Sequence, residues 1–260
     1  MSEHRARKRF GQHFLHDHQV INKILLAIAP QPGDTLVEIG PGLGAITLPL
    51  LERCGSLIAV ELDRDVIPRL QAAASGKGAL RVIQGDALKT DLRALVPPGT
   101  RLRLVGNLPY NVSTPLLFHF LDQADVIKDM HFMLQKEVVQ RMAAAPGGKE
   151  YGRLTVMLAA RCRVEPLFRI GAGAFSPPPK VESAFVRLTP YTVPPCSIDD
   201  PARFAQVVTQ AFSHRRKTLR NALLGTLDDA GFQAAGIDPQ RRPETLSPAD
   251  YARLANLRRP

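Results

Sequence analysis

The sequence predicts an α/β protein with a mostly parallel β-sheet, helices on both faces of the sheet, and a small all-helical domain after it. Between residues 35 and 137, short apolar or β-branched runs alternate with helical patterns, which is typical of parallel strands joined by helices. The segment 191–200, rich in proline and polar residues, fits neither periodicity and is predicted to be a linker. Because helical spacing resumes after it, the sequence predicts domains over 1–190 and 201–260.

The elements of the first domain follow one another in a regular order. After a basic arm over 1–17, apolar side chains at helical spacing predict a helix over 18–29, which the following PQPG would end. The sequence then predicts strands over 35–40, 57–62, 80–85, 101–107 and 131–137, with helices over 45–54, 65–74 and 113–123. Two later strand-like runs, 161–170 and 181–190, flank a Gly/Pro-rich segment and could complete the sheet as an antiparallel pair.

Composition narrows the class of partner. Hydrophobic residues make up 45% of the chain and charged residues 22%, so most of the chain should fold. A net charge of +10 favours a polyanion, and RNA, DNA and anionic membranes all fit this charge. Residues 201–260 hold 10 Lys and Arg against 5 Asp and Glu, which concentrates positive charge in the helical domain.

Other classes of protein are disfavoured by what the sequence lacks. The three cysteines have no CxxC spacing, so neither a disulfide framework nor a zinc site is expected, and a cytoplasmic protein is the simplest interpretation. No HExxH or similar ligand spacing occurs, so we expect no metal site. Neither a signal peptide nor an apolar stretch long enough to span a bilayer is found, so membrane insertion is not expected.

A glycine-rich loop after the first strand predicts a nucleotide-like cofactor. Gly40, Gly42 and Gly44 form GxGxG, whereas a dinucleotide site would normally have GxGxxG, so this spacing disfavours NAD. Glu61 ends the second strand, where a carboxylate could accept hydrogen bonds from two ribose hydroxyls. Asp86 follows the third strand and could accept from an adenine amine. Together these three strand ends predict a site for one adenosine.

The segment NLPYN (107–111) follows the fourth strand and suits the activation of an aromatic amine. The lone pair of adenine N6 is delocalised into the ring, so the amine attacks poorly until acceptors hold its hydrogens. The Asn107 side-chain carbonyl and the Leu108 backbone carbonyl could be those acceptors, and Tyr110 could stack on the extruded base. A sulfonium methyl donor carries its own leaving group, which would explain why the motif contains neither a histidine nor a carboxylate.

The order of these motifs resembles that of the ribosomal RNA adenine N6-dimethyltransferase family, and most closely its bacterial small-subunit (16S) members. The similar segments cover nearly the whole chain, at 5–15, 37–47, 60–63, 85–88, 107–117, 175–188 and 212–223. The resemblance implies a Rossmann-like methyltransferase fold with a seven-stranded sheet, and S-adenosylmethionine as cofactor. It also implies late small-subunit biogenesis, with dimethylation of two adjacent adenosines in the 3′-terminal hairpin loop of 16S ribosomal RNA.

The resemblance also implies roles for individual residues. Cofactor contacts are implied at His13, Leu15, Gly40, Glu61, Asp86 and Asn107. At the first of these positions the family usually has asparagine. If the usual contact is made by the side chain, the histidine could alter cofactor affinity or make it pH-sensitive, whereas a backbone contact would change little.

Two further groups of residues are implied to contact RNA. Phe175 resembles the loop aromatic of the family that packs against the target adenine. The alternative is that Phe175 and the prolines after it only form a rigid hairpin connection. A basic helix that contacts RNA phosphates is implied at Arg215, Arg216, Lys217 and Arg220. A solvated helix face is the alternative explanation of these charges.

Three other functions are compatible with parts of the sequence. The first is a related methyltransferase of large-subunit ribosomal RNA that confers antibiotic resistance, although the basic helical tail favours the small subunit. The second is a non-catalytic RNA-binding assembly factor, which the intact NLPY disfavours. The third is a nicotinamide-dependent oxidoreductase, which the GxGxG spacing disfavours. We expect a monomer.

Overall fold

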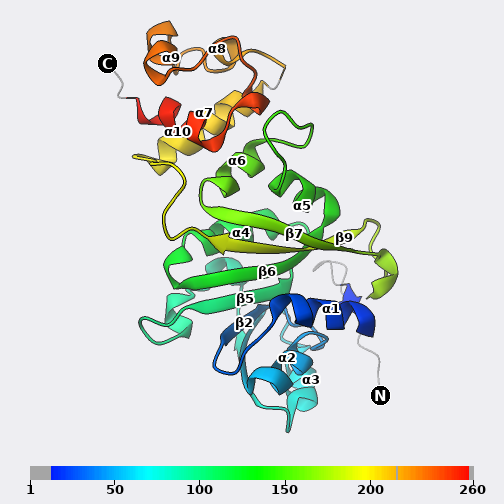
Figure 1. Cartoon of the computed structure of the whole chain (residues 1–260). Coiled ribbons are helices and arrows are strands. Elements are labelled where there is room, and N and C mark those ends of the chain that lie inside the picture. The colour runs from blue at the N-terminus through cyan, green and yellow to red at the C-terminus, as the bar shows by residue number, and fades with distance from the viewer. Residues whose placement is uncertain (1–12, 215, 258–260) are drawn as a thin grey trace. The chain divides into compact units, whose positions relative to one another are not determined.

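The computed structural model describes residues 13–214 and 216–257 (Figure 1). The predicted mostly parallel seven-stranded sheet is confirmed, with strand order β4-β3-β2-β5-β6-β9-β7. These strands are β2 (Thr35–Ile39), β3 (Ser56–Glu61), β4 (Ala79–Gln84), β5 (Leu102–Asn107), β6 (Ile127–Gln135), β7 (Cys162–Ile170) and β9 (Ser183–Pro190). Strands β4, β3, β2, β5 and β6 are parallel, and β9 pairs antiparallel with β6. The strand order reverses at β2, so a crevice is expected where β2 and β5 end.

The helices up to residue 159 are α1 (His18–Ile28), α2 (Thr47–Cys54), α3 (Ile67–Ala74), α4 (Ser113–Leu121), α5 (Lys136–Met142) and α6 (Arg153–Ala159). The Asp17 side chain caps α1 by accepting from the backbone N–H groups of Gln19 and Val20. Short 3-10 turns lie at η2 (Ala87–Lys89), η3 (Arg93–Leu95), η4 (Ala124–Val126) and η5 (Ala172–Ala174). The sequence did not predict α5 or α6, and the strand predicted over 131–137 ends at Gln135.

The chain divides into two compact units. The first contains the described residues up to Val139 together with Glu165–Pro190, and the second contains Gln140–Val164 and the described residues from Tyr191 onward. Each unit has its own hydrophobic core. None of the helices in the described ranges is long and apolar enough to cross a membrane.

The second unit is mostly helical; in Figure 1 its segment 140–164 is green and its residues after 190 run from yellow to red. Its elements after residue 200 are α7 (Pro201–Ser213), α8 (Leu219–Ala222), α9 (Asp229–Ala235), η6 (Pro243–Thr245) and α10 (Pro248–Asn256). Tyr151, which lies before α6, is 1% exposed and donates a hydrogen bond of 2.7 Å to the Leu246 carbonyl. The segment 140–164 therefore packs with helices from the end of the chain, as part of the same core.

A second, two-stranded sheet joins distant parts of the first unit. Strand β1 (Phe14–Leu15) pairs antiparallel with β8 (Phe175–Ser176). The sequence did not predict these strands, because two residues are too few to show a periodicity. The pairing brings the segment before α1 next to the Gly/Pro-rich segment between β7 and β9.

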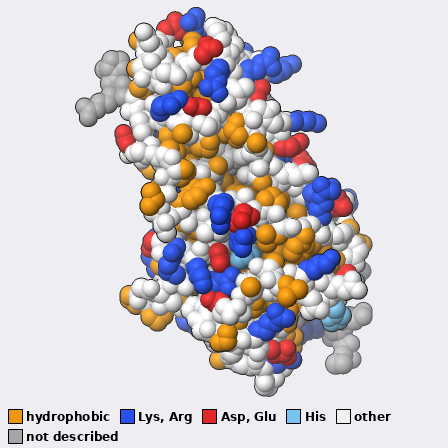
Figure 2. All heavy atoms as spheres, in the orientation of Figure 1, with side chains coloured by type: hydrophobic (Ala, Val, Ile, Leu, Met, Phe, Trp, Pro, Cys, Tyr) orange, Lys and Arg blue, Asp and Glu red, His pale blue; other side chains and the backbone are white. Residues whose placement is uncertain are grey.

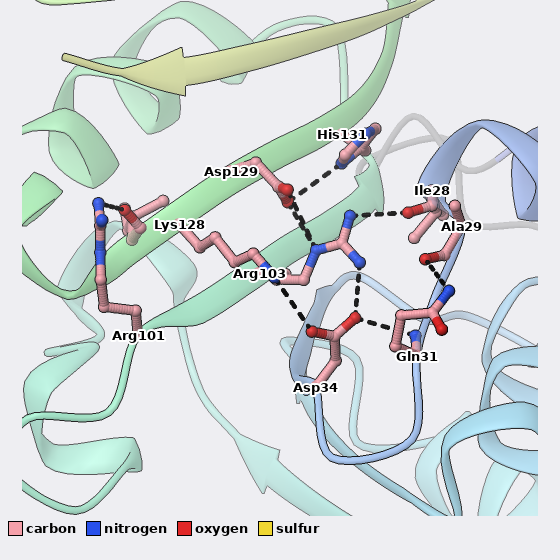
Figure 3. Close-up of polar contacts among 10 residues, drawn as sticks. Ile28, Ala29, Gln31, Asp34, Arg101, Arg103, Lys128, Asp129 and His131 are labelled. Carbon is pink, nitrogen blue, oxygen red and sulfur yellow. Dashed lines mark hydrogen bonds and ion pairs between the residues drawn. The ribbon is translucent and has the colours of Figure 1, made fainter. Parts of the chain in front are cut away.

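A buried ion-pair network ties α1 to the sheet (Figure 3). The Arg103 guanidinium donates to Asp129 Oδ1 at 2.9 Å, to Asp34 Oδ2 at 2.7 Å and to the Ile28 carbonyl oxygen at 2.7 Å. Burial alone would raise the pKa of both aspartates, but hydrogen bonds and the positive charge of Arg103 leave each pKa below its usual value. The network lies near the start of β5, at the opposite end of the strand from Asn107.

Candidate functional site

A cavity of about 920 Å³ opens at the carboxyl ends of the parallel strands. Its walls come from the loops after β2, β3, β4 and β5, together with the segment from His13 into α1. Eight predicted site residues line it: His13, Leu15, Gly40, Glu61, Asp86, Asn107, Leu108 and Tyr110. Residues from distant parts of the sequence therefore meet in one cavity, which lies entirely within the first compact unit.

The glycine loop is held by Glu61, which is 7% exposed. Its Oε2 accepts from the Gly42 N–H at 3.1 Å, and its Oε1 accepts from the Asp63 N–H at 2.8 Å. Burial raises the pKa of Glu61, while these backbone donors lower it. At Gly42, φ is +55° and an added Cβ would lie 3.3 Å from the Phe14 ring, so the loop requires glycine there.

Asp86 lines the cavity directly after β4, the strand next to β3. Its Oδ1 accepts from the Leu88 N–H at 3.0 Å and caps η2, which holds the carboxylate at the end of β4. Two leucines that the sequence analysis missed, Leu43 and Leu62, also line the cavity and are 38% and 53% exposed. They add apolar surface to the cavity wall, and no local pattern distinguishes them from ordinary loop leucines.

Asn107 ends β5, where its side chain is oriented by the segment before α1. The amide Nδ2 donates to the His13 carbonyl oxygen at 3.2 Å, so the amide oxygen is the atom that can accept a hydrogen bond from a ligand. The Leu108 N–H donates to the Met133 carbonyl oxygen at 3.2 Å, which fixes the turn after β5 against β6. Two candidate acceptors for an amine are therefore held at the end of one rigid strand.

Tyr110 and His13 form an aromatic pair at the cavity. The two rings stack with centroids 6.2 Å apart and planes inclined by 25°. The Tyr110 hydroxyl shares a hydrogen bond of 2.7 Å with the Ser183 hydroxyl, and burial raises the pKa of Tyr110. The His13 Nδ1–H donates to the Pro177 carbonyl oxygen at 2.8 Å. The His13 side chain thus contacts the protein on two sides, and its carbonyl holds Asn107.

Phe175 lies in a different environment from the other predicted site residues. Its side chain is 2% exposed and belongs to the hydrophobic core of the first unit, and its backbone pairs with Leu15. The ring would have to leave this core to stack on a base. The stacking role therefore stays a prediction, and the observed role of Phe175 is packing.

Glu38 is a buried acidic residue of the cavity wall that the sequence analysis did not assign. It lies in the middle of the sheet on β2, opposite Ala59 of β3 and Val105 of β5. Its side chain lines the cavity and is 2% exposed, and its Oε2 has no hydrogen-bond partner among the described residues. A carboxyl group in such surroundings is unusual, because burial disfavours its charged form.

The prediction that the basic residues from 215 to 220 lie on one helix is wrong. Helix α7 ends at Ser213, and Thr218 has the extended backbone of a new N-cap (φ −67°, ψ 159°), so Arg216 and Lys217 lie in the connection between two helices. Both side chains are exposed. Arg220 lies in α8 and forms an ion pair of 2.8 Å with Asp229. The fourth predicted residue, Arg215, lies outside the described residues.

On the one face that Figure 2 draws, positive charge is spread over many separate side chains. On the face drawn in Figure 2, Lys and Arg side chains are interspersed with acidic and apolar ones. A single continuous basic patch is therefore not seen in this view, and any RNA contact on this face would involve separate cations.

Comparison with known proteins gives matches over nearly the whole chain. The model of the family described as ribosomal RNA adenine dimethylase matches residues 3–259. A relative from Pseudomonas aeruginosa, the ribosomal RNA small subunit methyltransferase A, is 56% identical over 98% of this chain and 95% of its own length. The protein of the same name from Nitrosococcus oceani is 57% identical over 96% of this chain and 95% of its own length.

Two solved structures are similar over most of their length. A dimethyladenosine transferase from Plasmodium falciparum has a TM-score of 0.76 and 26% identity, covering 93% of this chain and 96% of that protein. The 23S rRNA methyltransferase ErmE has a TM-score of 0.73 and 25% identity, covering 93% of this chain and 98% of that protein.

Proposed function

Because the chain belongs to the ribosomal RNA adenine dimethylase family, we propose that it dimethylates N6 of two adjacent adenosines in the 3′-terminal hairpin loop of 16S ribosomal RNA, late in small-subunit assembly. The enzyme class, a ribosomal RNA adenine dimethyltransferase, and the cofactor, S-adenosylmethionine, follow from the family and from the relatives. The observation that carries the proposal is the cavity that brings Glu61, Asp86 and Asn107 together. A ribosomal substrate would place the reaction in the cytoplasm, and a site built within one compact unit supports action as a monomer.

The residues of the cavity fit S-adenosylmethionine. Glu61 and Asp86 are acceptors at the ends of adjacent strands, as a ribose and an adenine require. Gly40, with φ of +67°, lets the backbone come close to the methionine end, where the buried Glu38 adds an acidic group to the wall. When bound, this cofactor would supply a methyl group from its sulfonium, and the neutral thioether left behind needs no protonation to leave.

The chain's own residues would make the target amine nucleophilic and position it. The Asn107 amide oxygen and the Leu108 carbonyl oxygen accept from the two N6 hydrogens, which draws the nitrogen lone pair out of the ring. Because the Asn107 Nδ2 is held by the His13 carbonyl, the acceptor need not reorient during the reaction. Tyr110 would stack on the base, with its hydroxyl anchored on Ser183.

Methylation of large-subunit RNA is the second candidate function, because ErmE shares the fold over most of both chains. The small-subunit relatives are more than twice as similar in sequence as ErmE, which favours the small subunit. A non-catalytic assembly factor and a nicotinamide-dependent oxidoreductase are disfavoured, because the site combines NLPY with the GxGxG loop.

The proposal is tested by incubating the protein with methyl-labelled cofactor and small ribosomal subunits that lack these modifications. Label should appear on two adjacent adenosines of the 3′-terminal hairpin, and large subunits should stay unlabelled. Label confined to large-subunit RNA would support the second function, and no label on either subunit would contradict methyltransferase activity.

Glu61→Ala should weaken cofactor binding at least tenfold. The substitution removes two proposed ribose hydrogen bonds to a charged acceptor, each worth about 1 to 3 kcal/mol, and also the acceptor of the Gly42 N–H. Titration calorimetry measures the change. Glu52→Ala is the control, because it removes a more exposed carboxylate from the same cavity wall, and it should change affinity little. If the wild type, Glu61→Ala and Glu52→Ala bound the cofactor with equal affinity, the ribose would have to bind at a residue other than Glu61.

Replacing Arg215, Arg216 and Lys217 together with Ala should make RNA binding less sensitive to salt. Each phosphate contact contributes a slope of about −0.7 to −0.9 to the plot of log affinity against log salt, so loss of three contacts should make it shallower by about 2 units. Filter binding over a range of salt concentrations measures the slope. Arg242→Ala removes one exposed cation from the second unit and should leave the slope unchanged. If the triple variant kept the slope of the wild type, these three side chains would be solvated and would make no contact with RNA phosphates.

A further inference from the structure

The segment that carries Asp86 is fastened to the end of helix α4 by two side chains. This segment, 85–92, follows β4 and contains the 3-10 turn η2. Its backbone groups need partners from elsewhere in the chain, because one short turn satisfies only some of them. Two such partners are the side chains of His119 and Gln123, which bond to backbone atoms 29 to 33 residues earlier in the sequence.

Gln123 is a polar residue that is only 5% exposed. Its amide Oε1 accepts from the Leu92 N–H at 2.7 Å, and its Nε2 donates to the Thr90 carbonyl oxygen at 3.3 Å. Burying an amide is unfavourable unless its hydrogen bonds are made, so a residue that served only to fill this space would be apolar. The side chain of Gln123 therefore acts as a tie between α4 and the segment 85–92.

His119 adds a second hydrogen bond to the same tie. Its Nε2 lies 2.9 Å from the Thr90 carbonyl oxygen, and because a carbonyl oxygen can only accept, Nε2 carries the proton and donates it. With its proton placed there, this nitrogen cannot accept from Gln123 Nε2, which is 3.2 Å away. Both side chains therefore donate to one carbonyl oxygen, that of Thr90.

Thr90 passes this restraint on to Asp86. The Thr90 hydroxyl donates to the Asp86 carbonyl oxygen at 3.0 Å, and the Lys89 N–H donates to the same oxygen at 2.9 Å. The Asp86 carboxylate is held in turn by the Leu88 N–H. A group that recognises a ligand has to be held within about 0.5 Å of its productive position, and residues outside the site commonly provide that support.

We propose that Gln123 and His119 are positioning residues for the adenine of the cofactor, because they fix the segment from which Asp86 accepts the adenine amine. This inference rests on the proposed function, since it requires that the cavity binds S-adenosylmethionine with its adenine at Asp86. Neither side chain is among the described residues that line the cavity, so their effect is transmitted through Asp86. Helix α4 begins at Ser113, directly after NLPYN, so the helix beside the target-base site also holds the adenine site of the cofactor.

The test compares two ligands that differ at position 6 of the purine. S-adenosylhomocysteine has the amine there, and S-inosylhomocysteine has a carbonyl oxygen, which cannot donate to a carboxylate. Titration calorimetry of the whole protein gives both dissociation constants. The wild type should bind the adenine ligand about ten- to a hundredfold more tightly, as expected for one hydrogen bond to a charged acceptor.

Gln123→Leu and His119→Leu should each reduce this preference for adenine at least about threefold, because Asp86 is then held less firmly. A variant that is merely less stable has a smaller folded fraction, which weakens the binding of both ligands by the same factor and cancels in their ratio. The preference therefore separates positioning from a general loss of stability.

Two further variants serve as controls. His119→Gln keeps an N–H donor close to the position of Nε2 and should retain most of the preference that His119→Leu loses. Arg93→Ala removes an ion pair with Asp125 that also joins the chain after Asp86 to the chain after α4. Because these side chains are 47% and 58% exposed, the pair holds weakly, and its loss should leave the preference unchanged.

Two outcomes would overturn the positioning role. One is a preference equal to that of the wild type in folded Gln123→Leu and His119→Leu proteins. The other is an equal loss of preference in Arg93→Ala, which would mean that any loosening of this region has the same effect. A wild type that bound both ligands equally well would instead contradict the placement of adenine at Asp86, and a wild type that bound neither would contradict the proposed function.

Discussion

Asn107→Ala is expected to reduce methyl transfer by about a hundred- to a thousandfold, as the loss of one preorganised polar group in a transition state commonly does. The substitution removes the proposed acceptor of an N6 hydrogen. RNA affinity should stay close to that of the wild type, because phosphate contacts dominate it. Single-turnover methylation of small subunits, with RNA binding measured separately, gives both quantities. The substitution is therefore expected to lower the rate of methyl transfer and to leave the RNA dissociation constant nearly unchanged.

The Asn107 variant has a natural control in the same loop. Asn111→Ala removes an exposed amide four residues away and should retain most of the activity. Asn107→Ala also removes the hydrogen bond to the His13 carbonyl, so the folded state should be checked by thermal unfolding. If a folded Asn107→Ala protein kept most of its turnover, the activation of the amine would have to be assigned to other groups.

Arg103→Ala is expected to lower the free energy of unfolding by about 3 to 5 kcal/mol, because it leaves two aspartates without their buried cation. The Arg103 side chain is 7% exposed, and its partners Asp34 and Asp129 are 11% and 14% exposed, so water replaces it poorly. Urea denaturation at neutral pH measures the loss. A change below about 1 kcal/mol would mean that the network is as weak as a surface ion pair.

The control and the pH dependence of this effect follow from the same network. Lys128, which is 56% exposed, also pairs with Asp34, and Lys128→Ala should cost at most about 1 kcal/mol. The pKa values of Asp34 and Asp129 are lowered in the folded protein, so their contribution to stability is present above a pH of about 4 and is lost as the pH falls through their folded pKa values. The difference between wild type and Arg103→Ala should therefore shrink in acid.

The parts of the fold that depend on local pattern could be predicted from the sequence. The parallel strands and the helices between them are long enough to show a periodicity, and their boundaries differ from the predicted ones by only a few residues. The break between α7 and α8 was missed, because the charged run 214–218 fits a helix and only its backbone shows otherwise. The packing of 140–164 with the C-terminal helices depends on contacts between distant residues.

The site shows the same division between local and distant information. Motif spacing was enough to select Glu61, Asp86 and Asn107, because strand ends in a parallel sheet meet at one edge. It could not show that the His13 carbonyl orients Asn107, nor that Phe175 lies in the core. Glu38 was missed because the sequence does not show that its carboxyl group is buried and partly unpaired.

The pairing of β1 with β8 also sets an order of events during protein synthesis. Phe14 and Leu15 leave the ribosome early, but the strand with which they pair ends at Ser176 of a 260-residue chain. Until then a growing chain can contain the glycine loop and Asn107 while β1, which lines the cavity, lacks its partner strand. Because such long-range pairing must follow the local elements, we expect nascent chains shorter than this to hold the cofactor poorly. The capacity for methyl transfer would thus be acquired late in translation, well after the motifs themselves have been made.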